Sequence, residues 1–318
     1  MAKKVKLYLF ILEMGLLFIV LMSVYLLLPN RHFRIIINQG ETLSTISSKL
    51  KDNHLIISKK LFIKLVDFTN SSKKLKAGIY SFSCKDNMIS ILRTLRKGSK
   101  DNIKITIPEG STIKQIAHIV SQKISIDEEN FIKIATMRNI EGYLMPDTYF
   151  VVPGIDEEQI IDIMHNEFNK RITPNMLKRA KEINVDFKDI IILASIIEKE
   201  AAIAEERPII SAVFYNRLKK KIRLQSCATV LYAMGINKEK LTIKDTKFKS
   251  PYNTYLHFGL PPGPICSPGM ASIDAALYPA DVKSLFFVSK GNGEHLFADD
   301  LREHNKNKQE VSKVKRVS

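Results

Sequence analysis

The chain has 318 residues, of which 45% are hydrophobic and 26% are charged, so it can form two or three domains with cores and is not a disordered protein. Its formal net charge of +16 leaves nucleic acid, anionic lipid and other acidic polymers open as partners. The three cysteines, Cys84, Cys227 and Cys266, are too few and too scattered for a disulfide framework, and no Cys/His spacing indicates a metal site. The sequence therefore predicts no metal and no cofactor.

The N-terminal segment predicts a membrane anchor. Three lysines in residues 1–6 precede an apolar run over residues 7–28, which is long enough to span a bilayer as a helix. No small-x-small cleavage site follows Leu28, which disfavours the alternative of a cleaved signal peptide. The lysines place residues 1–6 in the cytoplasm and the rest of the chain on the periplasmic or extracytoplasmic side of the cytoplasmic (inner) membrane. This topology argues against a nucleic-acid partner.

An internal repeat lies within the predicted second region, residues 30–135. Residues 35–46 and 105–116 each predict a short strand, a glycine turn and a helix, followed by a second apolar stretch. The matched positions are Gly40 and Gly110, Thr42 and Thr112, and Ile46 and Ile116. Such strand–turn–helix–helix pieces resemble the LysM module, a small carbohydrate-binding fold. A plain βα unit is the alternative. Between the copies, residues 75–82 predict a strand and residues 88–98 an amphipathic helix.

The third region, residues 136–305, is mostly helical. Thr173 followed by Pro174 predicts a helix start, Asp186 predicts the start of the next helix, and Pro208 interrupts the helical pattern. Residues 284–288 and 295–297 flank a glycine-rich turn and predict a β-hairpin. The basic tail, residues 306–318, is polar and predicted to be disordered. The expected fold is α+β: a single N-terminal transmembrane helix, a LysM-like strand-helix domain and a mixed, helix-rich catalytic domain.

The apolar helix that starts near Asp186 contains two carboxylates at its end, Glu198 and Glu200. A charge on a buried face is costly unless it is paired or protonated, and a carboxylic acid that keeps its proton near neutral pH can serve as a general acid. Apolar residues surround both positions on a helical period, so spacing does not separate them. The alternative is that one is a buried structural carboxylate and the other is solvated or paired with Lys199 or Arg207.

Several segments together resemble the endolytic murein transglycosylases, the YceG-like family. The segment L-A-S-I-I-E-K-E that contains Glu198 is similar to that family's sequence, and further similar segments occur in family order over nearly the whole chain. These segments are 141–149 (E-G-Y-L-M-P-D-T-Y), 213–218, 224–226, 250–255, 259–269 (G-L-P-P-G-P-I-C-S-P-G), 286–297 and 303–305.

The resemblance implies a membrane-anchored lytic transglycosylase that cleaves the β-1,4 bond from N-acetylmuramic acid to N-acetylglucosamine within nascent peptidoglycan strands. It assigns the catalytic acid/base to Glu198 and a supporting position to Glu200. The implied partners are peptidoglycan glycan strands, the cytoplasmic membrane and peptidoglycan synthases. Gln225, Tyr252 and Asn253 lie in loop-like segments and have amides and a ring suited to sugar binding, although Asn253 could equally be a turn residue.

One departure from the family and two rival functions stay open. Cys227 stands where many family members have an aspartate, so we infer no essential carboxylate at that position. A lysozyme-like hydrolase would need a second carboxylate, for which Glu141, Glu205 and Glu206 are candidates. A glycan-binding cell-wall scaffold would bind the same polymer without cleaving it.

Overall fold

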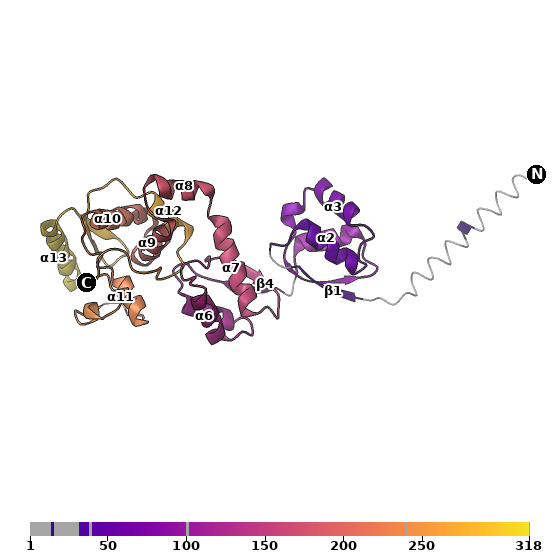
Figure 1. Ribbon diagram of the computed structural model, residues 1–318, viewed down its shortest axis with the longest axis horizontal. Helices are drawn as coiled ribbons and strands as arrows, with labels where there is room; N and C mark the ends of the chain where they lie inside the picture. The colour runs from indigo at the N-terminus through magenta and orange to yellow at the C-terminus, as the bar shows by residue number, and fades with distance from the viewer. Residues whose placement is uncertain (1–13, 16–31, 38–39, 100–101, 239–240, 318) are drawn as a thin grey trace, which may run out of the picture. The chain divides into compact units, whose positions relative to one another are not determined.

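The computed structural model describes residues 14–15, 32–37, 40–99, 102–238 and 241–317 (Figure 1). The chain divides into two compact units, Met1–Asn102 and Ile103–Ser318, whereas the sequence placed the division at residues 135/136. The anchor predicted at residues 7–28 lies outside the described residues, apart from Met14 and Gly15. Within the described ranges, no helix combines the length and apolar character needed to cross a membrane.

The first unit is a two-stranded antiparallel sheet with helices. Strand β1 (His32–Ile37) pairs with β2 (Gly78–Ser83), and Ile35 lies opposite Tyr80. Between the strands come α2 (Leu43–Asp52), α3 (Lys59–Phe68) and the 3-10 helix η1 (Ser72–Lys74), and α4 (Met88–Lys97) follows β2. The side chains of Thr42 and Ser58 accept backbone N–H groups at the starts of α2 and α3. The buried core includes Ile35, Leu50, Phe62, Phe82 and Leu95.

The second unit begins with the second copy of the repeat. Strand β3 (Ile103–Thr106) pairs antiparallel with β4 (Thr148–Val151), and between them lie α5 (Ile113–Ser121) and α6 (Glu128–Met137). Thr112 and Gln115 form a capping box at the start of α5. Both copies therefore have the order strand, helix, helix, strand. Because β4 closes the second copy only at residue 151, a division at residue 135 would separate paired strands.

The rest of the second unit is a group of helices around α9 (Phe187–Glu200). Helix α9 contacts α8 (Pro174–Glu182), α10 (Arg207–Lys219), α11 (Cys227–Met234) and α12 (Met270–Leu277), as Figure 1 shows for α8, α10 and α12. Every residue from 190 to 197 of α9 is buried, so this helix is the centre of the core. The predicted starts at Asp186 and Thr173 are confirmed. The remaining elements are α7 (Glu157–Arg171), η2 (Ala204–Glu206) and η3 (Asp245–Lys247).

The C-terminal part contains the predicted hairpin and one correction. Strand β5 (Phe286–Ser289) pairs with β6 (His295–Ala298), which confirms the hairpin. The prediction of a disordered tail is wrong, because α13 (Leu301–Val317) covers most of it. The ring of His304 stacks on Phe286, Asn307 donates a hydrogen bond to the Phe297 carbonyl, and Val311 is buried. These few contacts bind a polar helix to the hairpin, and composition alone did not reveal them.

Candidate functional site

The side chain of Glu198 lies in the last turn of α9 and is held by two groups from other elements. The backbone N–H of Gly269, at the start of α12, donates a hydrogen bond of 3.0 Å to its Oε2. Nη2 of Arg207, from the start of α10, lies 3.7 Å from its Oε1. The Glu198 side chain is 7% exposed, so its carboxyl group is largely removed from water yet not sealed off.

Two chain segments distant in sequence meet beside Glu198. Ser111 and Ser267 form an isolated antiparallel bridge, in which Gly110 N–H donates to the Ser267 carbonyl at 2.8 Å and Ser267 N–H donates to the Ser111 carbonyl at 2.9 Å. Lys199 Nζ donates to the Gly110 carbonyl at 3.2 Å. The loop of the second repeat copy and the proline-glycine loop are thereby fixed around the end of α9.

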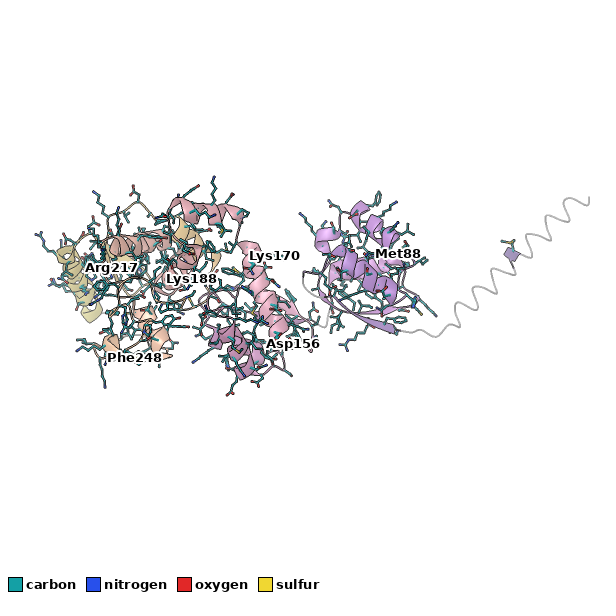
Figure 2. The ribbon with its side chains drawn as sticks, viewed as in Figure 1. Met88, Asp156, Lys170, Lys188, Arg217 and Phe248 are labelled. Atoms are coloured by element: carbon teal, nitrogen blue, oxygen red, sulfur yellow. The ribbon has the colours of Figure 1, made fainter. Side chains whose placement is uncertain are left out.

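The side chain of Glu200 contacts a different element, helix α11. Two residues along a helix rotate a side chain by about 200°, so Glu200 points away from Glu198. Its Oε1 accepts a 2.5 Å hydrogen bond from Ser226 Oγ, at the N-terminus of α11. Burial raises the pKa of Glu200, while the hydrogen bonds from Ser226 and the Ala228 N–H act in the opposite direction. The positive charge of the buried Arg217, labelled in Figure 2, also favours the carboxylate.

The three predicted sugar-binding residues have different surroundings. Gln225 is exposed, with a φ of 50°, and its backbone N–H binds the Thr254 carbonyl. Tyr252 is partly buried, with its ring centroid 5.0 Å from that of Tyr232. Asn253 is 0% exposed, and its amide nitrogen donates to the carbonyls of Thr246 and Phe248. Asn253 therefore holds its own loop, the alternative that the sequence left open, and only Gln225 and Tyr252 remain available to a ligand.

Cys227 occupies the first position of α11. Its Sγ lies 3.1 Å from the Tyr255 hydroxyl, and burial raises the pKa of the thiol. A neutral thiol in this place cannot supply the anionic contact of an aspartate. Within the described part of the chain, no three His, Cys, Asp or Glu side chains gather as a metal site.

Two charged residues lie near Glu198. Arg207 is one of the two basic residues that the sequence offered as an ion-pair partner, whereas Glu109 was not predicted. Arg207 is fixed by a hydrogen bond from its Nε to Ser272 Oγ. Glu109 belongs to the loop before α5, and burial and the charge of Glu198 raise the pKa of its carboxyl group. The first repeat copy contains Gln39 at the matching position, and this difference between the copies was the available signal.

The carboxylates considered for a second catalytic role are spread over the unit. Glu141 is mostly buried and accepts hydrogen bonds from the Ile113 N–H at 3.1 Å and the Tyr232 hydroxyl at 3.2 Å. Burial raises the pKa of Glu141 to about 7. Glu206 is paired with His295, whose Nδ1 lies 2.6 Å from its carboxylate, and Glu205 is exposed.

Comparison with known proteins identifies the family of this chain. The sequence model of the YceG-like family matches residues 35–310. The chain belongs to the YceG-like family. The endolytic murein transglycosylase of Bacillus subtilis (strain 168) is 36% identical over 300 residues, which cover 86% of this chain and 83% of that protein.

Two further relatives support the family assignment. The endolytic murein transglycosylase of Streptococcus pneumoniae serotype 2 is 29% identical over 314 residues, and the match covers 85% of this YceG-like chain but only 57% of the streptococcal protein. The crystal structure of a yceG-like protein from Listeria monocytogenes superposes with a TM-score of 0.60 at 34% identity, covering 87% of this chain and 99% of that one. The YceG-like fold, helix-rich with small sheets, is thus shared with a solved structure.

Proposed function

We propose that this YceG-like chain is an endolytic peptidoglycan lytic transglycosylase and that Glu198 is its catalytic acid/base. The names of the relatives support the reaction. The observation that carries the residue assignment is the carboxyl group of Glu198, held by the Gly269 N–H and Arg207 at the meeting point of two loops. Glu200, in contrast, accepts a hydrogen bond from Ser226 at the start of α11.

The proposed reaction needs one acid/base and no water. Glu198 donates its proton to the glycosidic oxygen, and the bond from C1 of N-acetylmuramic acid to that oxygen breaks. The C6 hydroxyl of the same sugar attacks C1, and its proton returns to Glu198. The products are a free 4-hydroxyl on N-acetylglucosamine and a 1,6-anhydro ring. Attack within one sugar has a small entropic cost.

The hydrogen bond from Gly269 fixes Oε2, so we assign the transferred proton to Oε1. Oε1 lies 3.7 Å from Arg207 Nη2, beyond hydrogen-bond distance. After the proton leaves, both Gly269 and Arg207 stabilise the carboxylate that results. The same two groups hold the side chain in one orientation for the return of the proton.

The cellular setting completes the proposal. Residues 7–28 anchor the protein in the cytoplasmic membrane, so that the described units lie on the side where peptidoglycan is assembled. The strand–helix–helix–strand copies act as LysM-like glycan-binding modules, and cleavage of nascent strands terminates their elongation next to peptidoglycan synthases.

The test is mass spectrometry of fragments released from purified peptidoglycan strands by the full chain in detergent. We expect fragment ends lighter by one water than ordinary reducing ends. Glu198→Gln should lower the cleavage rate by about 10²- to 10⁴-fold, which is the usual contribution of a general acid. Glu129→Gln, at an exposed position on α6, is the matched control and should cleave like the unaltered protein.

Two outcomes would contradict the proposal. Ordinary reducing ends that incorporate ¹⁸O from labelled water would identify a hydrolase. Strand binding without any cleavage, unchanged by Glu198→Gln, would identify the glycan-binding scaffold.

A further inference from the structure

The carboxyl groups of Glu109 and Glu198 both lie against Gly269. The N–H of Gly269 donates to Glu198, and a Cβ placed on Gly269 would overlap Oε1 of Glu109 and lie 2.7 Å from its Oε2. Gly269 has a φ of −73° and a ψ of 163°, a conformation open to any residue. At this position a larger side chain would therefore displace the Glu109 carboxylate, while the backbone conformation would accept it.

The two carboxylates share one cation but differ in accessibility. Arg207 stabilises the charge of Glu109 and also lies near Oε1 of Glu198. Burial and the negative charge of Glu198 raise the pKa of Glu109, which indicates that the two acidic groups interact. Glu109 is nevertheless an exposed residue, whereas the Glu198 side chain is only 7% exposed. Of the two, Glu109 is the one that a bound sugar can reach more freely.

The backbone holds Glu109 in this place from both sides. On one side its loop begins after β3, and the Ile107 N–H donates to the Asp147 carbonyl. On the other side Gly110 and Ser111 form the bridge to Ser267. A loop bonded in this way presents a side chain in a defined position, as an electrostatic role in catalysis requires.

We propose that Glu109 is a second catalytic residue, whose carboxylate faces the muramic acid ring and stabilises the positive charge that develops at C1 while Glu198 protonates the leaving oxygen. This inference rests on the proposed function. Glu109 forms no bond to the sugar and transfers no proton. Its negative charge acts on the oxocarbenium-like transition state, after which O6 closes on C1 and its proton passes to Glu198. The positive charge of Arg207 favours the ionised form of Glu109, against the effects of burial and of the Glu198 charge.

The first test compares Glu109→Gln with Glu129→Gln in the full chain, measuring kcat and KM on purified strands. Glu109→Gln keeps the size of the side chain and removes its charge, so we expect kcat to fall by about 10²- to 10³-fold with little change in KM. Glu129→Gln should not change either constant. Unaltered kcat in Glu109→Gln would overturn the inference.

The second test separates charge from structure. Glu109→Ala leaves a space beside Gly269 that formate can enter, and we expect formate to restore part of the kcat of Glu109→Ala but none of that of Glu109→Gln, whose side chain fills the space. Loss of activity without rescue by formate, or a raised KM with unaltered kcat, would overturn the inference. The end groups made by the unaltered protein test the proposed function independently: 1,6-anhydro ends with full activity in Glu109→Gln would reject only the role of Glu109.

Discussion

Glu141 is a mostly buried carboxyl group whose protonation couples stability to pH. Burial raises its pKa from 4.5 to about 7, so the folded protein binds this proton more tightly than the unfolded chain does. Its contribution to the free energy of unfolding is complete below pH 4.5 and is lost as the pH rises to about 7. The loss amounts to about 3 kcal/mol.

Glu141→Gln should remove this dependence on pH, because the amide oxygen can accept from Ile113 or Tyr232 without becoming charged. The measurement is the midpoint of thermal unfolding of the full chain at pH 5 and pH 8. We expect the difference between the two midpoints to shrink in Glu141→Gln and to persist in Glu129→Gln. An undiminished difference in Glu141→Gln would show that another group is responsible.

Gly269 offers a way to displace Glu109 without altering it. An alanine at position 269 is compatible with the backbone, but its Cβ would overlap the Glu109 carboxylate, which is the flexible end of a side chain and can move away. We expect Gly269→Ala to change the free energy of unfolding by less than about 1 kcal/mol and to lower kcat at least tenfold. In the Glu109→Ala background the same substitution should have little further effect, since the overlapping group is gone. Additive losses in kcat would contradict this coupling.

At the scale of elements, α9 shows what periodicity can and cannot predict. Its start at Asp186 and its buried face follow from a cap and an apolar run, and both are local features of the sequence. The different surroundings of Glu198 and Glu200 are not local. They depend on α12 and α11, whose positions are set by loops far away in sequence. Glu109 could not be predicted for the same reason. The bridge between Ser111 and Ser267, which are far apart in sequence, brings the loop of Glu109 next to Glu198.

The contact of α9 with α11 gives a prediction for stability. Ser226→Ala removes the 2.5 Å hydrogen bond to the buried Glu200 carboxyl group and should lower the free energy of unfolding by about 1–3 kcal/mol. Fragment end groups should stay unchanged, because Glu198 and Gly269 are not involved. Denaturant unfolding measures the first effect and mass spectrometry the second. A shift from anhydro to ordinary reducing ends in Ser226→Ala would assign Glu200 a direct part in the chemistry.

At the scale of the molecule, the repeat explains why the sequence and the structure divide the chain at different residues. The two copies were visible because glycine, threonine and isoleucine recur at matched positions, and both copies have the same order of elements. The copies differ in their tertiary contacts. The first is closed by β2 within its own unit, whereas the second contributes the loop containing Glu109 to the unit of α9. Sequence similarity between the copies does not reveal such a difference.

This division predicts that residues 103–318 fold without the first unit. Their two hydrophobic cores, one around α5 and α6 and one around α9, are both separate from the core of the first unit. We expect this part of the chain to unfold cooperatively and to produce the same glycan ends from short soluble strands as the full chain.

A shorter protein fragment, which begins at residue 136, lacks β3 and Glu109, so it should fail to fold cooperatively. It tests whether the second repeat copy belongs to the catalytic unit. Cooperative unfolding of the shorter fragment, with cleavage retained, would place the division at residue 135 and would remove the loop of Glu109 from the site.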